Sequence, residues 1–137
     1  MQRVVVDANV FLSFIVHRND KQRDAAKALL AKAEDGELLA ILPQFVVFEI
    51  LYVLQSAYSM RDEELSKLTR DLLALPGVQL TDESPWRRVF DVWPRPLPSL
   101  ADASIVAVAL ANRYEAVATF DRKLGNRLES FGLVSYW

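Results

Sequence analysis

The stretch Arg3–Phe11, RVVVDANVF, decides the fold. Its three consecutive valines form a short β-branched run without polar alternation, which is typical of a strand buried in a parallel sheet. The run ends at Asp7, and a helix over 9–17 is predicted to follow directly, with Asp7 or Asn9 as its cap. A strand that leads straight into a helix indicates a βα unit at the start of the chain.

Strand and helix signals then alternate along the sequence. Apolar runs predict further strands over 38–42, 78–80, 116–120 and 133–136. Helical periodicity and capping residues predict helices over 20–35, 44–58, 62–75, 84–92 and 99–114. This alternation predicts an α/β fold with a mainly parallel central sheet and helices on both faces. Such sheets bind ligands outside the carboxyl ends of their strands.

Two of these segments carry specific expectations. The helix over 44–58 is apolar nearly all round, and such a helix is expected to be buried. Pro94, Pro96 and Pro98 predict a stiff, extended connector, because each proline fixes its own φ and pushes the preceding residue out of the helical region.

The composition predicts one domain over residues 1–137 and restricts its chemistry. An apolar fraction of 52% supports a single core. The chain has no cysteine, which excludes thiol catalysis and disulfides. Its one histidine, His17, is expected at the surface, and a single histidine excludes a histidine-rich metal cage. Any metal site is mostly oxygen-liganded, which suits Mg²⁺ or Mn²⁺. With a net charge of −2, a nucleic-acid partner must be held by local basic side chains or by metal ions.

Two apolar stretches are too interrupted to be membrane segments. Asp7 and Asn9 lie within residues 4–16, and Glu49 lies within residues 38–54. A membrane span needs roughly 20 mostly apolar residues. We therefore expect a soluble, cytoplasmic protein with no membrane partner.

Four carboxylates stand at positions that a parallel sheet can bring together. Asp7 and Asp121 follow strands, and Asp102 lies in the first turn of a helix. Each of these can instead serve as a helix cap or complement a helix dipole. Glu49 interrupts an otherwise apolar helix, where a lone carboxylate is costly unless it pairs with an arginine or binds a cation.

Taken together, the four carboxylates favour a metal site. Converging carboxylates repel one another, and one or two divalent cations resolve that repulsion. An oxygen-liganded Mg²⁺ or Mn²⁺ centre with few other polar groups is suited to hydrolysing phosphodiester bonds.

At this point the sequence resembles the PIN-domain family, and within it the VapC-type toxins. The resemblance rests on the segment around Asp7, on Glu49, on residues 101–109 (ADASIVAVA) and on residues 118–124 (ATFDRKL), in that order along the chain. It implies a three-layer α/β/α nuclease fold and a metal-dependent endoribonuclease that acts as the toxin of a toxin–antitoxin pair.

The resemblance also implies roles for particular residues. Asp7 and Asp102 match direct ligands of Mg²⁺ or Mn²⁺, and Glu49 and Asp121 match second-site or water-mediated ligands. Together these four would be the catalytic residues. Asn9 and Thr119 match positions next to the cluster that the family often fills with small polar residues.

The implied partners are RNA, a second copy of the chain in a homodimer, and an antitoxin whose disordered tail folds across the active-site groove. Arg122 and Lys123, beside Asp121, are the best candidates for contacts with the RNA backbone. Aromatic side chains either line the antitoxin groove or belong to the core: Phe14, Phe48, Tyr52, Trp86 and Trp93.

Three alternatives remain open from the sequence. The first is a PIN-domain nuclease of RNA processing or decay without an antitoxin, and the second is a catalytically silent binding module. The third is a phosphotransferase with Asp7 as nucleophile, which would need an acid–base carboxylate two positions later, where Asn9 stands instead.

Overall fold

The computed structural model describes all 137 residues. The chain forms five strands, seven α-helices and one 3₁₀ helix. In order these are β1 (Gln2–Val6), α1 (Ala8–Ile15), α2 (Asp20–Glu34), β2 (Leu38–Pro43), α3 (Gln44–Tyr58), α4 (Asp62–Leu73), β3 (Val78–Thr81), α5 (Trp86–Val92), α6 (Leu100–Asn112), β4 (Ala116–Ala118), α7 (Arg122–Gly125), η1 (Leu128–Phe131) and β5 (Val134–Ser135).

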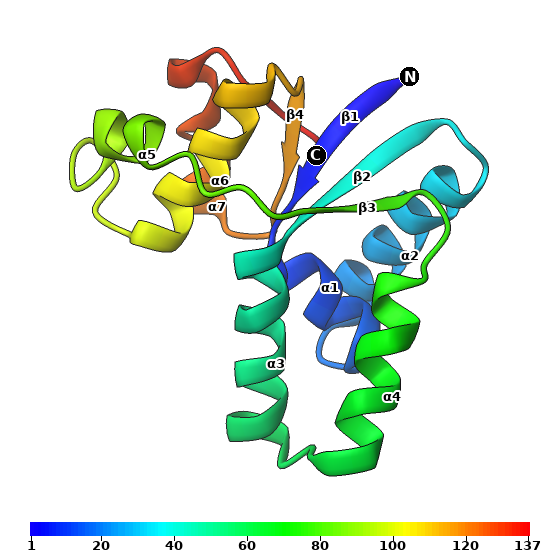
Figure 1. Cartoon of the computed structure of the whole chain (residues 1–137). Helices are drawn as coiled ribbons and strands as arrows, with labels where there is room; N and C mark the ends of the chain where they lie inside the picture. Colours follow the sequence, from blue (N-terminus) through cyan, green and yellow to red (C-terminus); the bar gives the residue numbers. More distant parts are fainter.

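The five strands form one all-parallel sheet in the order β3-β2-β1-β4-β5. The chain steps from β1 through β2 to β3, then returns past β1 to β4 and β5. Because crossovers between parallel strands are right-handed, this reversal places α1 to α4 on one face and α5 and α6 on the other. Figure 1 shows the division, with α5 and α6 to the left of the sheet, α2 to its right, and α1 and α4 below it. The predicted three-layer α/β/α fold is confirmed.

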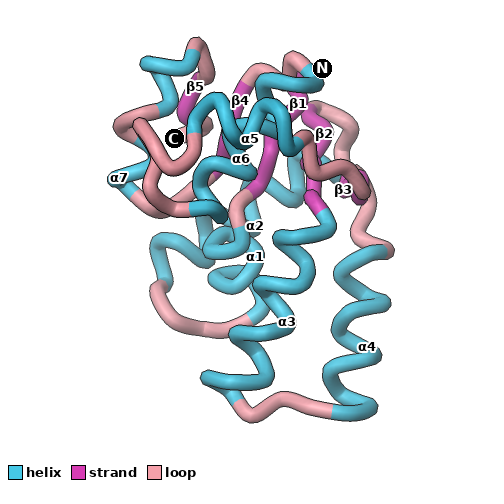
Figure 2. Tube along the Cα trace, turned by 60° about the vertical axis from the view of Figure 1, so that its left-hand side comes forward, coloured by secondary structure: helices cyan, strands magenta, loops and turns pink.

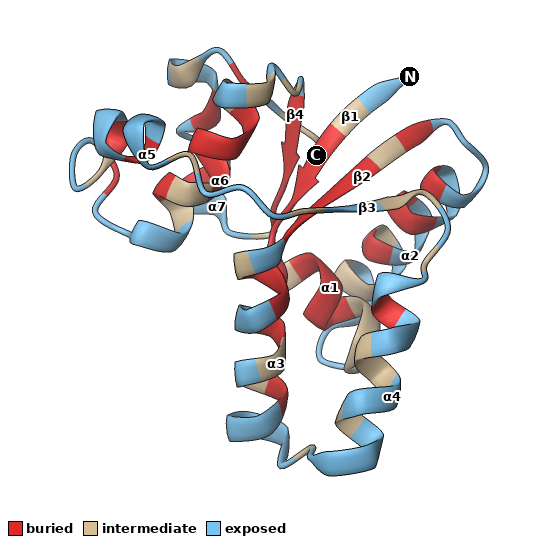
Figure 3. Cartoon of the chain, in the orientation of Figure 1, coloured by how far each residue is buried: buried red, intermediate tan, exposed pale blue.

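The central strands form the deepest part of the core. Val4, Val5 and Val6 of β1 and all three residues of β4 have no exposed surface. Helices lie on both faces of the sheet, and β4 and the inner part of β1 have the red colour of buried residues in Figure 3. This burial explains why the strands read as continuous apolar runs rather than as alternating patterns.

The helices α3 and α4 form a hairpin that projects beyond the sheet (Figures 1 and 2). One side of α3 packs towards α1 and buries Val46, Ile50 and Leu54. The other side carries Phe48 and Tyr52, which are 64% and 70% exposed. The prediction that this helix is buried is therefore wrong, because α3 runs past the end of the sheet and no element covers its outer side.

The proline-containing connector between α5 and α6 also differs from its prediction. Residues 93–96 form a turn rather than an extended segment. The N–H of Leu97 donates to the carbonyl oxygen of Val92 (2.9 Å), Leu97 is buried, and the indole N–H of Trp93 donates to the carbonyl oxygen of Pro98 (3.2 Å). These contacts fold the connector back onto α5, which the restriction of proline φ does not prevent.

The two apolar stretches examined as membrane segments are each divided between a strand and a helix. Residues 4–16 contribute to β1 and α1, and residues 38–54 to β2 and α3. No helix in the molecule is both long enough and apolar enough to cross a membrane.

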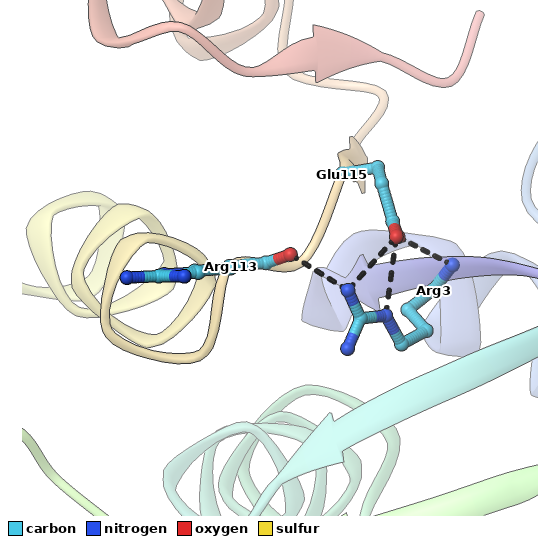
Figure 4. Close-up of polar contacts among 3 residues, drawn as sticks. All are labelled: Arg3, Arg113 and Glu115. Carbon is cyan, nitrogen blue, oxygen red and sulfur yellow. Dashed lines mark hydrogen bonds and ion pairs between the residues drawn. The ribbon is translucent and has the colours of Figure 1, made fainter.

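A polar clamp joins β1 to the segment before β4 at the amino ends of these strands (Figure 4). The guanidinium of Arg3 donates from Nε and Nη2 to Glu115 Oε1 (3.1 and 2.9 Å), and its backbone N–H donates to Oε2 (2.8 Å). Nη2 also donates to the carbonyl oxygen of Arg113 (2.9 Å). The Arg3 guanidinium beside it lowers the pKa of Glu115 to about 2. The clamp therefore helps to fix the register of β1 against β4.

The lowered pKa of Glu115 predicts a pH-dependent contribution to stability. A carboxyl whose pKa is lower in the folded than in the unfolded protein stabilises the fold above its unfolded pKa, and this contribution is lost as pH falls towards the folded pKa. We expect Glu115→Gln to lower the melting temperature at pH 7 by roughly a few degrees, because exposed pairs contribute little each. The difference from wild type should shrink as pH falls from 4.5 towards about 2. Thermal unfolding between pH 7 and pH 3 measures it.

The matched control is Asp71→Asn, which removes the exposed Lys67–Asp71 pair within α4 (3.0 Å). It should change the melting temperature less than Glu115→Gln. A Glu115→Gln effect of the same size at every pH would contradict the role assigned to the charged clamp.

Candidate metal centre

The strands β1 and β4 lie side by side where the chain reverses its direction across the sheet. Val6 pairs with Ala118, and the N–H of Asp7 donates to the carbonyl oxygen of Ala118 (2.9 Å). At such a reversal the following helices leave towards opposite faces and open a crevice beyond the carboxyl ends of the strands. Asp7 and Thr119 are the first residues of the chain beyond these two strand ends.

The buried carboxylate of Asp7 accepts three hydrogen bonds. Its Oδ1 accepts from the N–H of Ala8 (2.8 Å) and so caps α1. Its Oδ2 accepts from the hydroxyl of Thr119 (2.8 Å) and from the amide of Asn9 (3.3 Å). Burial raises the pKa of Asp7 above its ordinary value, the hydrogen bonds lower it, and the negative charge of Asp121 raises it further. None of the three ion pairs in the molecule includes Asp7.

Asn9 and Thr119 tie the two strand ends together. Besides its bond to Asp7, the Asn9 amide donates to Thr119 Oγ1 (3.2 Å), and Asn9 Oδ1 accepts from the N–H of Phe120 (3.0 Å). Thr119 Oγ1 also accepts from the N–H of Asp121 (3.1 Å). These bonds draw Thr119 and Phe120 out of the sheet, so β4 ends at Ala118 and not at Phe120 as predicted. Asn9 and Thr119 thus both contact the carboxylate of Asp7, as expected from the sequence.

Glu49 and Asp102 reach the same region from α3 and α6. Ser99 caps α6 by accepting from the N–H of Asp102 (3.2 Å), which fixes Asp102 in the first turn. Partial burial raises the pKa of both carboxyls, and the charge of Asp7 raises both further. Asp102 also raises the pKa of Glu49, and Asp121 raises that of Asp102. The four negative charges therefore act on one another across a single region.

The surroundings of Glu49 differ from those expected from its apolar neighbours. Its side chain lies on the exposed side of α3, and it forms no ion pair with an arginine. The apolar residues beside it in sequence do not enclose it, because α3 is buried on one side only. Its raised pKa comes from partial burial and from Asp7 and Asp102, not from isolation in the core.

Asp121 performs a structural task with one of its oxygens. Its Oδ1 accepts from the N–H groups of Lys123 (2.9 Å) and Leu124 (3.4 Å) and thereby caps α7. The residue is exposed, and its Oδ2 makes no hydrogen bond within the protein. Asp121 thus combines the cap that the sequence allowed with an oxygen that remains open to a ligand.

The donor set fits a hard divalent cation. No group of three or more carboxylate or imidazole side chains forms a ready-made metal cage in this structure. The chemistry of the region nevertheless matches such an ion, because Asp7 is buried without a cationic partner and three further carboxylates add negative charge beside it. Carboxylate oxygens are the ligands that Mg²⁺ and Mn²⁺ prefer.

The basic residues near the carboxylates divide into free and engaged side chains. Arg122 and Lys123 are exposed, and neither side chain forms an ion pair or a hydrogen bond. Arg18 instead donates to the carbonyl oxygen of Asn9 (3.2 Å) and to the hydroxyl of Ser13 (3.0 Å). His17 is exposed and pairs with Asp20, which confirms its expected place at the surface.

Two cavities flank the carboxylates. One, of about 290 Å³, lies beside Glu49 and is lined mainly by apolar residues that include Phe45, Trp86 and Leu100. The other, of about 540 Å³, is mainly polar and includes Thr119 and Asp121. No sequence motif predicts the second cavity, because its lining comes from separate segments at the start of α2, after β4 and around β5.

The aromatic residues singled out in the sequence fall into two groups. Phe48, Tyr52 and Trp86 are exposed. Phe14 and Trp93 are partly buried and pack against the core.

Comparison with known structures finds the same fold in proteins of low sequence identity. VapC20 of Mycobacterium tuberculosis, described as a sarcin-ricin loop cleaving toxin, matches with a TM-score of 0.69 and 15% identity over 96% of both chains. VapBC2 of Rickettsia felis, bound to a DNA fragment from its promoter, matches with a TM-score of 0.67 and 13% identity over 99% of both chains. FitAcB of Neisseria gonorrhoeae matches with a TM-score of 0.65 and 17% identity over 98% of this chain and 96% of that one.

Comparison of the sequence with curated proteins gives no match. The model of the PIN domain matches residues 4–127, which include β1 from Val4 onwards, all four carboxylates and every helix up to α7. The chain therefore belongs to the PIN-domain family.

Proposed function

We propose that this protein is a Mg²⁺- or Mn²⁺-dependent endoribonuclease, that residues 1–137 act as one domain, and that it is the toxin of a toxin–antitoxin pair. One observation carries the proposal: the buried, unpaired carboxylate of Asp7 and three further carboxylates act on one another beside the β1–β4 reversal of a PIN domain. Converging carboxylates at the carboxyl ends of parallel strands suit metal-dependent hydrolysis of a phosphodiester bond.

The metal would be held by Asp7 and Asp102 directly and by Glu49 and Asp121 through a second site or through water. When bound, a divalent ion supplies an activated water molecule and stabilises negative charge on the phosphate. Thr119 and Asn9 orient the Asp7 carboxylate and keep it from rotating. Asp121 presents Oδ2 while its other oxygen holds the start of α7.

The free cations of Arg122 and Lys123 would hold the RNA backbone beside Asp121. Phosphate contacts of this kind position a nucleic acid without reading its sequence. They also supply the local positive charge that a protein with a net charge of −2 otherwise lacks.

The toxin role is supported by the low-identity structural relatives, one of which is described as a toxin and another as a VapBC complex. We propose that the chain forms a homodimer and binds an antitoxin in the cytoplasm. The exposed aromatic side chains of Phe48, Tyr52 and Trp86 supply apolar surface for such a partner. If the protein has no antitoxin, the same site would serve a nuclease of RNA processing or decay. Expression of the protein without a partner separates the two roles, because only the toxin should be toxic to the cell.

The proposed metal ligands predict a loss of cleavage in Asp7→Asn. The substitution removes one negative charge and keeps an oxygen that can cap α1. We expect metal-dependent cleavage of a mixed RNA panel to fall at least about 100-fold. Wild type and variant are assayed in parallel with Mn²⁺, with Mg²⁺ and with EDTA.

Asp24→Asn is the matched control, because Asp24 is an exposed carboxylate on α2 that makes no hydrogen bond or ion pair. It should cleave like wild type. Undiminished cleavage by pure, folded Asp7→Asn protein would falsify the assigned site. A covalent phosphate on Asp7 would instead revive the phosphotransferase, and folded wild type inactive on every RNA would favour a binding module.

Metal binding should also appear as a gain in stability. Burial and like charges raise the pKa values of Asp7, Glu49 and Asp102, so the metal-free fold loses stability as pH rises through these values. A bound divalent cation reverses this penalty. At a metal concentration about 100 times its dissociation constant, the free energy of unfolding should rise by about 2.7 kcal/mol.

Thermal unfolding of the metal-free protein with and without Mn²⁺ at pH 7 measures this gain, and a series towards pH 4 should reduce it as the carboxylates become protonated. In EDTA at pH 7, Asp7→Asn should be at least as stable as wild type, because it removes a buried charge. Equal gains in wild type and in Asp7→Asn would show that the metal binds elsewhere.

A further inference from the structure

The polar cavity of about 540 Å³ lies directly beside the carboxylates. Asp121, one of the four carboxylates, lines the cavity. Thr119 lines it too, and its Oγ1 donates to the buried carboxylate of Asp7 (2.8 Å). The rest of its lining comes from the start of α2, from α7 and from the residues around β5. A molecule in this cavity would therefore touch the residues that surround the proposed metal.

An ordered aromatic stack lines one part of the cavity. The rings of Phe120 and Trp137 stack with centroids 4.6 Å apart and planes 19° apart. Tyr136 packs edge-on against Trp137, with centroids 5.2 Å apart and planes at 88°. Trp137 remains 46% exposed. Phe120 therefore stacks on one side of the indole, Tyr136 contacts it edge-on, and the part of Trp137 that stays open to solvent can stack on a further planar group.

The remaining lining offers hydrogen bonds and positive charge. Asn126 makes no side-chain hydrogen bond, and Asn19 and Gln22 use only their amide oxygens, which accept from the Gln22 N–H (2.9 Å) and the Ser13 hydroxyl (3.3 Å). Their NH₂ groups stay free. Lys21 and Arg122 form no ion pair within the protein.

We propose that this cavity binds one unpaired nucleotide of an RNA, next to the phosphate that lies at the carboxylates, with its base stacked on Trp137. This inference rests on the proposed function. Free amide groups match the hydrogen-bonding edges of a base, and Lys21 and Arg122 match its phosphates. A base in a duplex is already stacked and paired, so the subsite requires single-stranded RNA.

The first experiment measures equilibrium binding of a fluorescein-labelled, single-stranded RNA of mixed sequence in EDTA, by anisotropy. Stacking on an aromatic side chain contributes enough that Trp137→Ala should weaken binding about 5- to 100-fold. Trp137→Phe keeps a flat ring and should bind within about threefold of wild type. Tyr58→Ala, which removes a comparably exposed aromatic side chain (40%) at the far end of α3, should bind like wild type.

A second readout separates stacking from a structural role of Trp137. The same RNA without its label should quench the tryptophan fluorescence of wild type, and part of this quenching should disappear in Trp137→Phe although that variant still binds. Duplex RNA of the same sequence should quench less. The quenching decides the question even if thermal unfolding shows that Trp137→Ala is destabilised.

The outcomes distinguish this inference from the proposed function. Unchanged binding by folded Trp137→Ala, or quenching that is the same in Trp137→Phe, overturns the subsite, while metal-dependent cleavage by wild type still supports the nuclease. The expected binding and quenching without any metal-dependent cleavage support the subsite and count against the nuclease. Trp137 quenching by a peptide but not by RNA overturns the inference in favour of a protein-binding site.

Discussion

The geometry of the acidic region depends on one buried carboxylate. Asp7 lies where β1 meets β4, and its charge is stabilised by a backbone N–H, a hydroxyl and an amide rather than by a cationic side chain. These donors come from both strand ends, so the carboxylate can stay buried only while β1 and β4 keep their register. The Arg3–Glu115 clamp fixes the same two strands at their other ends. A polar contact at the amino edge of the sheet thus supports the geometry at the carboxyl edge.

Two of the four carboxylates also cap helices. Asp7 uses Oδ1 to cap α1, and Asp121 uses Oδ1 to cap α7. Ser99 caps α6 and so places Asp102 in the first turn, where the helix dipole favours a negative charge. In each case the start of a helix fixes the position of a carboxylate. A fold that begins its helices at the carboxyl ends of parallel strands therefore assembles an acidic region from ordinary local structure.

The sequence predicts the layers and the position of this region because both follow from local patterns. Valine and alanine runs marked the central strands, and the acids after them fell at one edge. The metal-binding role of the quartet remains a prediction. Burial of α3 was predicted wrongly, because composition does not reveal that the helix projects beyond the sheet. The clamp and the polar cavity were not predicted at all. Arg3 and Glu115 are 112 positions apart, and the cavity combines segments that no motif connects.

The order of the strands also determines when, during translation, the acidic region around Asp7 can assemble. Asp7 emerges from the ribosome early, whereas its partner Thr119 directly follows β4 and is made more than a hundred residues later. Until β4 has emerged and inserted beside β1, a nascent chain holds Asp7 without the hydroxyl that binds it and without Asp121 beside it. Pairing between such distant segments is among the later events of folding. Incomplete chains therefore lack the assembled region, and whatever chemistry it performs begins only after nearly all of the domain has been synthesised.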